Sequence, residues 1–243
     1  MAQDSRSAGG ETPGIFITFE GGEGAGKTTH VRILAAALES RGAEVLTVRE
    51  PGGTKVGEML RGIVLDPGNA ALSARAELLI YEAARAQIVD EVIAPALARG
   101  AVVVCDRFTD STVAYQAAGR GLARAFVDAA NEFASQGIVP NRTILLRVGE
   151  GASEGLARAT RRFSADRLER EGQEFHQRVN EAFAAIAAAD PVRVRTVTSY
   201  TSKRRTARAV FDALADLFPW LSEPAVLDAA FDAVYGKRGK RRG

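Results

Sequence analysis

A glycine-rich octapeptide at residues 21–28 is the first part of the chain whose spacing suggests chemistry. It reads Gly-Gly-Glu-Gly-Ala-Gly-Lys-Thr and matches the pattern G-x-x-x-x-G-K-[ST] at every fixed position. Glycines let consecutive backbone N–H groups point inward around phosphate, and the following helix adds its positive N-terminus. In this pattern Lys27 reaches the β- and γ-phosphates and the Thr28 hydroxyl ligates Mg²⁺. The motif predicts an ATP site formed by Gly21, Gly22, Glu23, Gly24, Ala25, Gly26, Lys27, Thr28 and Thr29.

Two arginines follow other strands that the sequence predicts. Arg49 stands before Glu50, and Arg107 lies between Asp106 and Phe108. In a doubly wound sheet both belong to the carboxyl edge of the strands, where ligands bind. Arginine pairs with phosphate through two parallel hydrogen bonds, so the pair suits an acceptor that is itself an anion. The alternative interpretation is that each arginine makes a structural ion pair with the acid beside it.

The motif leaves several function classes to compare. GTPases need a guanine-reading N-K-x-D tetrapeptide, which the chain lacks, and helicases and motor ATPases usually bring larger domains. A nucleoside monophosphate kinase is favoured, because an ionised phosphate acceptor needs positioning and neutralised repulsion rather than a general base. Two alternatives stay open: a kinase for dUMP or dCMP, and a DNA-associated ATPase that uses the basic C-terminal tail.

Alternating strands and helices are expected to position these residues. Apolar runs predict strands at 15–20, 43–48, 101–106, 142–148 and 192–198, because parallel strands covered on both faces are nearly continuously apolar. Helical segments are expected at 27–41, 55–65, 73–99, 123–136, 153–163, 171–189 and 203–218, with Pro95 kinking or splitting the third. This alternation predicts an α/β fold with a doubly wound five-stranded parallel sheet flanked by helices.

Composition limits the remaining possibilities. The chain has 243 residues, 46% of them hydrophobic, which allows one large α/β domain. We expect a flexible leader at 1–13, a main domain at 14–220, and a C-terminal extension at 221–243, in which 226–234 suits a short packing helix.

Cys105 is the single cysteine, which fits a reducing cytoplasm, and no apolar run is long enough to span a membrane. Five of the last eight residues are basic; a frayed, solubilising tail is favoured over nucleic-acid binding.

Several motifs together resemble the bacterial thymidylate kinase family, from about residue 15 to residue 218. They are Glu20 to Thr29, then Arg49-Glu50-Pro51-Gly52-Gly53-Thr54, then Asp106-Arg107-Phe108 with Ser111-Thr112 and Ala114-Tyr115-Gln116. The stretch Asp166-Arg167-Leu168-Glu169 with Phe175 is similar to that family's lid and the helix after it. Agreement of several separate motifs in order and spacing is far more specific than the phosphate-binding loop (P-loop) at residues 21–28 alone.

The resemblance implies transfer of the ATP γ-phosphate to dTMP, giving dTDP and ADP, by a cytoplasmic homodimer of the P-loop nucleoside monophosphate kinase fold. It implies that Arg49 and Arg107 hold the acceptor phosphate with help from Arg61, and that Asp106 acts with Thr28 on Mg²⁺. For the nucleoside it implies that Glu23 meets the 3′-hydroxyl and Tyr115 disfavours a 2′-hydroxyl. Tyr81, Arg85, Thr112 and Gln116 match positions beside the base.

The resemblance also implies a short helical lid at about 149–170. Arg158, Arg161 and Arg162 share one face of the helix expected there, and Arg167 follows shortly after. The P-loop's variable positions hold no basic residue, so lid arginines would supply the missing cation, with Arg161 and Arg162 as the catalytic candidates. Arg147 departs from the family, which often has an acid there; this puts the lid hinge in doubt but no residue assigned to chemistry.

Overall fold

A parallel sheet forms the centre of the protein in the computed structural model, which describes residues 13–148 and 166–236. Within those residues the sheet has five strands, as the sequence predicted, and they lie in the order β2-β3-β1-β4-β5. In chain order they are β1 (Ile15–Glu20), β2 (Val45–Arg49), β3 (Val102–Asp106), β4 (Arg142–Val148) and β5 (Val194–Ser199). Asp106 is in register with both Phe19 and Arg49. The loops after the three strands therefore start at one level.

Helices connect consecutive strands, and two more follow β5. They are α1 (Lys27–Glu39), α2 (Lys55–Leu65), α3 (Ala74–Ile88), α4 (Ala94–Ala98), α5 (Thr109–Thr112), α6 (Arg124–Ser135), α8 (Gln173–Ala189), α9 (Lys203–Ala213) and α10 (Pro224–Tyr235). Short turns of other helix types lie at Pro67–Asn69, Val89–Ile93, Val113–Gly119 and Pro219–Ser222. Of the helices in these described segments, none is long and apolar enough to cross a membrane.

Two helix predictions have clear outcomes in the structure. The expected 73–99 helix is split, because a π-helical turn at Val89–Ile93 separates α3 from α4, which carries Pro95 in its first turn. The splitting prediction at Pro95 is confirmed. The helix expected at 203–218 is shorter and ends at Ala213, while the helix expected at 153–163 lies outside the described residues.

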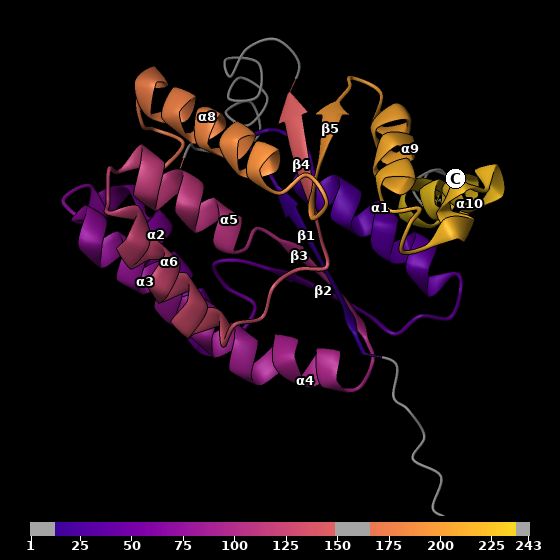
Figure 1. The fold of residues 1–243 in the computed structure, drawn as a ribbon, viewed down its shortest axis with the longest axis horizontal. Helices are drawn as coiled ribbons and strands as arrows, with labels where there is room; N and C mark the ends of the chain where they lie inside the picture. Colours follow the sequence, from indigo (N-terminus) through magenta and orange to yellow (C-terminus); the bar gives the residue numbers. More distant parts are fainter. Residues whose placement is uncertain (1–12, 149–165, 237–243) are drawn as a thin grey trace, which may run out of the picture.

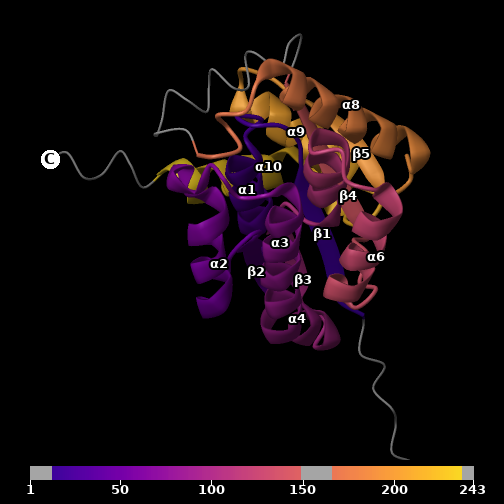
Figure 2. The ribbon, with the colours of Figure 1, turned by 90° about the vertical axis from the view of Figure 1, so that its left-hand side faces the viewer.

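The sheet is covered on both faces (Figure 1). Ile17 and Phe19 of β1 pack against α1, α9 and α10 on one face. Phe16, which points to the other face, packs with Ile88 and Ile93 from the α3–α4 segment. Alternate residues of one buried strand thus serve two hydrophobic cores, which is why the strand reads as a continuous apolar run. Turning the molecule by 90° brings α2, α3 and α6 to the front (Figure 2).

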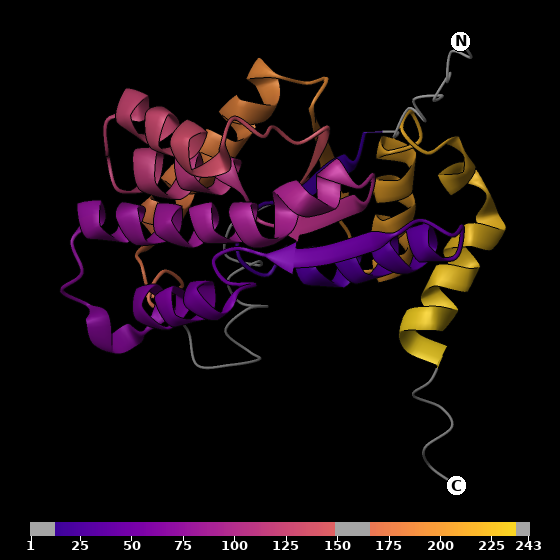
Figure 3. The same cartoon turned by 90° about the horizontal axis from the view of Figure 1, so that it is seen from below.

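The C-terminal helix is part of the packed structure. The sequence predicted a short packing helix at 226–234. In the structure Leu221 is fully buried, and Val226, Leu227 and Ala230 join the core around α1 and α9. Seen from below, α10 lies at the end of the molecule beside α1 and α9 (Figure 3). The packed chain therefore continues to Tyr235, because these apolar side chains are shielded from water by packing against α1 and α9.

Candidate active site

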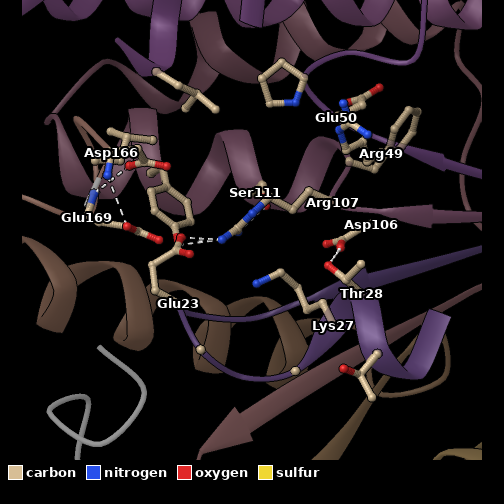
Figure 4. A pocket seen from close by; sticks show the side chains of 18 of the residues that line it. Glu23, Lys27, Thr28, Arg49, Glu50, Asp106, Arg107, Ser111, Asp166 and Glu169 are labelled. Atoms are coloured by element: carbon tan, nitrogen blue, oxygen red, sulfur yellow. Dashed lines mark hydrogen bonds and ion pairs between the residues drawn. The ribbon is translucent and has the colours of Figure 1, made fainter. Parts of the chain in front are cut away.

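A single cavity of about 700 Å³ lies at the carboxyl edge of the sheet and joins the P-loop to the loops after β2 and β3. Parallel sheets of this kind place ligand sites at that edge. Most residues predicted for the site line the cavity: Glu23, Gly24, Gly26, Lys27, Thr28, Thr29, Arg49, Arg61, Tyr81, Arg85, Asp106, Arg107, Thr112, Tyr115 and Gln116. Figure 4 shows part of this wall.

The P-loop backbone requires glycine at its first residue. Gly21 has a φ of 131°, and a Cβ there would come within 2.2 Å of the Leu146 carbonyl oxygen. The Lys27 ammonium donates hydrogen bonds of 3.0 Å to the carbonyl oxygens of Gly21 and Gly22. It is therefore held over its own loop, with its charge beside the space where phosphates bind. Burial and the nearby Arg107 lower the Lys27 pKa.

Arg107 connects the P-loop to the loop after β3. Its φ of 75° lies in the left-handed region, which is uncommon for arginine. The guanidinium donates to the Gly21 carbonyl at 3.2 Å, to the Ser111 hydroxyl at 3.1 Å and to a Glu23 carboxylate oxygen at 2.5 Å. The Tyr115 hydroxyl also donates to Glu23, at 2.9 Å (Figure 4). This backbone conformation aims the side chain at the P-loop.

Glu20, at the end of β1, holds the loop that carries Arg107. Its carboxylate accepts from the Phe108 backbone N–H at 2.7 Å and from the Ser111 hydroxyl at 2.5 Å. Burial and the nearby Asp110 raise the Glu20 pKa to about 7. Burial alone would also raise the pKa of Glu23, but Arg107 and Lys27 lower it to about 2. Glu23 is thus the ionised partner of Arg107, while Glu20 titrates near neutrality.

Thr28 and Asp106 provide the oxygen atoms for a divalent cation. The Thr28 hydroxyl lies 2.5 Å from a carboxylate oxygen of Asp106, and both line the cavity (Figure 4). A hydroxyl and a carboxylate are hard donors of the kind Mg²⁺ prefers. In the described part of the chain no three His, Cys, Asp or Glu side chains gather as a metal cage. Two protein oxygens fit an ion that takes its other ligands from phosphates and water.

Arg85 lies at the far end of the cavity and is held by buried acids. It is 2% exposed and donates to Glu50 at 2.9 Å, to Glu82 at 2.9 Å and to Asn131 at 2.6 Å. One Glu50 carboxylate oxygen is buried without a partner. The guanidinium is also 5.2 Å from the ring centroid of Phe108. Arg85 is therefore fixed in place before any ligand arrives.

A second buried acid, Glu77, holds Gln116. The Gln116 amide donates to Glu77 at 2.8 Å, and Arg120 pairs with the same carboxylate at 2.9 Å. A carboxylate only accepts, so the amide nitrogen of Gln116 faces Glu77. Arg167 also donates to Glu77 and, at 2.9 Å, to the Val64 carbonyl. These contacts bury the Arg167 side chain to 7% exposure, and Arg167 is not among the residues that line the cavity.

Arg49 and Arg61 are the more open cations of the cavity wall. Arg49 pairs with Glu58 at 2.9 Å, and Arg61 donates to the Pro51 carbonyl at 2.8 Å. Neither Arg49 nor Arg107 pairs with the acid next to it in sequence, since their partners are Glu58 and Glu23. The alternative interpretation of adjacent structural ion pairs is therefore wrong. With 53% of its side chain exposed, Arg49 is available to an incoming anion.

Some residues of the site escaped sequence reasoning. His30, which belongs to no predicted site, lines the cavity, and its Nδ1 lies 2.9 Å from the Gly26 carbonyl oxygen. A signal existed, because four residues separate it from Gly26 on the first turn of α1. Tyr200, Thr201 and Lys203 also line the cavity without belonging to any motif. Arg161 and Arg162 lie outside the described residues.

The fold and the cavity define a class of protein. A P-loop after β1 and an arginine-lined second half in the same cavity bring a nucleotide phosphate next to an anionic acceptor. That is the arrangement of a P-loop phosphotransferase acting on a nucleoside monophosphate.

Comparison with known proteins places the chain within this class. The thymidylate kinase family profile matches residues 19–210. Thymidylate kinase from Geobacter sulfurreducens is 47% identical over 212 residues, covering 85% of this chain and 99% of the relative. The thymidylate kinase from Pseudomonas fluorescens is 48% identical, covering 87% and 98%. A crystal structure of thymidylate kinase from Ehrlichia chaffeensis superposes with a TM-score of 0.69 at 29% identity, covering 84% of this chain and all of that one.

The chain belongs to the thymidylate kinase family, whose reaction is the ATP-dependent phosphorylation of dTMP to dTDP. The family and the fold expected from the sequence are both confirmed.

Proposed function

We propose that the chain performs this transfer in the cavity described above, with ATP on the P-loop and dTMP in the arginine-lined half. The observation that carries the proposal is the shared cavity, in which Lys27 and Arg107 both bond to the Gly21 carbonyl oxygen. The two phosphates that react then meet between these cations. An ionised acceptor phosphate needs in-line placement and charge neutralisation, and it needs no base to remove a proton.

On the donor side, backbone N–H groups from Gly21 to Thr29 bind the ATP phosphates. Lys27 neutralises negative charge on the phosphoryl group during its transfer. Thr28 and Asp106 are the residues that would hold Mg²⁺, whose chemistry is to neutralise charge on the phosphate oxygens. Their 2.5 Å hydroxyl–carboxylate contact supports this assignment, because it already brings two hard oxygens together.

On the acceptor side, Arg49, Arg61 and Arg107 hold the phosphate of dTMP. Glu23 accepts a hydrogen bond from the 3′-hydroxyl, which its low pKa favours because the carboxylate stays ionised. Tyr115 is 3% exposed and packs between Phe175 and Phe183, so its ring is a rigid wall against a 2′-hydroxyl.

The base lies between the remaining four residues. The Tyr81 ring stacks on thymine, while Arg85, Thr112 and Gln116 meet its polar edge. Arg85 offers only donors, so it suits the O4 carbonyl of thymine and opposes the amino group of cytosine. Because Glu50 and Glu82 hold the guanidinium in place, it cannot turn away from the wrong base without breaking buried ion pairs.

We also propose catalytic roles for Arg161 and Arg162 in the lid. The variable P-loop positions supply no cation, so another must cover the phosphoryl group during transfer. Arg161→Ala or Arg162→Ala should lower kcat by about tenfold or more, with a smaller change in the KM for dTMP.

A homodimer is the assembly we propose. Several large apolar residues on neighbouring helices are more than half exposed: Met59 on α2 at 66%, Leu79 on α3 at 57%, and Phe126 and Phe133 on α6 at 58% and 85%. These helices share one face of the molecule (Figure 2). Such a surface suits a second copy of the chain. The 14–220 domain boundary and the cytoplasmic location stay predictions.

The function is tested by measuring ADP release across a panel of nucleoside monophosphates. We expect dTMP to have a much higher kcat/KM than dCMP and dGMP. Equal kcat/KM for dTMP and dCMP would contradict the base assignment. ATP hydrolysis that needs no nucleotide acceptor, is stimulated by DNA and is lost when residues 236–243 are removed would favour the alternative of a DNA-associated ATPase.

A further inference from the structure

Helix α10 is packed onto the enzyme beyond the segment that matches the family. The family profile ends at residue 210, whereas α10 spans Pro224–Tyr235. Its buried face, Val226, Leu227 and Ala230, belongs to the same core as α1, the helix that begins at the P-loop lysine. Figures 1 and 3 show α10 beside α1 and α9. The helix is thus in direct contact with the element that starts the phosphate site.

Two aromatic side chains of α10 meet the first turn of α9. The Lys203 ammonium lies 5.2 Å from the centroid of the Tyr235 ring. The Phe231 ring lies one turn before Tyr235 on α10. The guanidinium of Arg204 lies 5.5 Å from the centroid of this ring and pairs with Asp228. Both are cation–π contacts that restrict a long, flexible basic side chain. Apart from the ion pair of Arg204 with Asp228, the two contacts differ in their relation to the cavity.

Lys203 belongs to the cavity wall, beside Tyr200 and Thr201, and Arg204 is not among the described residues that form it. The Lys203 carbonyl oxygen lies 3.4 Å from Nε2 of His30, whose Nδ1 lies 2.9 Å from the Gly26 carbonyl oxygen. A continuous set of contacts therefore runs from α10 through Lys203 and His30 to the P-loop. Both His30 and Lys203 line the cavity.

We infer that α10 positions the donor nucleotide, with Tyr235 as a positioning residue that holds Lys203 against the base or ribose of ATP. The inference rests on the proposed function, in which the P-loop binds the ATP phosphates and dTMP fills the half with Tyr81 and Arg85. The rest of ATP then extends toward Tyr200 and Lys203. There the ammonium supplies N–H donors to acceptor atoms of the base or ribose. Tyr235 acts by limiting where that ammonium goes.

The test compares Tyr235→Ala with Phe231→Ala in the full chain. Each variant removes one α10 ring from one basic residue of α9, but only Lys203 lines the cavity. We expect Tyr235→Ala to raise the KM for ATP about two- to fivefold, the size of an exposed cation–π contact, with the KM for dTMP unchanged. Phe231→Ala should leave both KM values at the wild-type level, with a similar fall in Tm. Tyr235→Phe should keep the wild-type KM because it keeps the ring.

A second variant and a second readout keep the result interpretable. Tyr235→Leu preserves apolar bulk without a π face, so it should fold like wild type and still weaken ATP binding. Calorimetric binding of a non-hydrolysable ATP analogue gives the same comparison without catalysis. A wild-type protein that binds the analogue but does not phosphorylate dTMP would overturn the proposed function and not the role of α10. Equal effects of Tyr235→Ala and Phe231→Ala on ATP affinity, or wild-type affinity in Tyr235→Leu, would overturn the role of α10.

Discussion

The two halves of the cavity are held by different means. In the P-loop half the backbone forms the site: Gly21, Gly24 and Gly26 have positive φ values, and Lys27 bonds to carbonyl oxygens of its own loop. In the acceptor half, side chains hold other side chains, as when Glu50 and Glu82 fix Arg85. One half depends on local conformation, and the other on buried charges brought together from distant segments.

This difference decides how each half responds to change. A backbone site keeps its donors whatever the neighbouring side chains are, provided that the glycines remain. A buried ion pair is fragile in another way, because loss of one partner leaves the other charged and unpaired away from water. Substitutions in the acceptor half should therefore affect stability and specificity together, whereas Arg107, which touches both halves, should affect catalysis most.

The largest expected effect is that of Arg107→Ala. It removes the cation that lies between the P-loop and the acceptor phosphate, and arginines in that role contribute ~10³ or more to kcat in phosphoryl transfer. It also leaves Glu23 buried without its 2.5 Å partner. Steady-state kinetics should show kcat reduced by about 10³. The double variant Arg107→Ala/Glu23→Gln should recover stability but not kcat. Recovery of kcat in that double variant would mean that Arg107 acts only by neutralising Glu23.

Glu77→Gln should be the most destabilising change in the acceptor half. Glu77 is fully buried and pairs with Arg120 and Arg167. Without it Arg167 loses its anion, whereas Arg120 keeps its pair with Glu171. Breaking a buried pair of this kind costs about 3–5 kcal/mol. Urea denaturation should show that loss, while Glu44→Gln, which breaks an exposed pair with Arg99, should change stability by less than about 1 kcal/mol. Equal losses in the two variants would contradict the view that burial makes Glu77 important.

The same contrast explains what the sequence could predict. The places of the P-loop and Arg107 in the cavity could be predicted because they follow from fixed local patterns, whereas Tyr115 was placed there by the family resemblance. The strands fell within two residues of their expected ends. Glu77 and Glu82 were missed, because on a helix an acid that faces a buried arginine has the same spacing as one that faces water. Lys203 was missed because its place in the cavity depends on the crossing of α9 and α10.

A pH experiment tests the raised pKa of Glu20, which contrasts with the lowered pKa values of Glu23 and Glu77. Burial raises the Glu20 pKa to about 7, so between pH 4.5 and 7 the folded state binds more protons than the unfolded state. The free energy of unfolding should therefore fall as pH rises through this window, by about 3 kcal/mol from this group. Glu20→Gln should remove the contribution of Glu20 to that slope, as measured by urea unfolding at pH 5, 6 and 7.5. Glu50, whose pKa burial also raises to about 7, should keep its own contribution. A variant with the wild-type slope would show that Glu20 is ionised throughout.

The smallest expected effect belongs to Tyr115→Phe, which removes one hydroxyl and keeps the ring. The hydroxyl donates to Glu23 at 2.9 Å and accepts from Arg107 at 3.2 Å, so its loss should lower stability by about 1 kcal/mol. The preference for dTMP over its ribose analogue should stay at the wild-type ratio, because the ring between Phe175 and Phe183 is the wall that meets a 2′-hydroxyl. Tyr115→Ala, which removes that wall, should narrow the ratio. Competition assays with both nucleotides measure it. A ratio that falls equally in both variants would show that the hydroxyl reads the sugar, and the acceptor half would then depend on a polar contact where we expect a steric one.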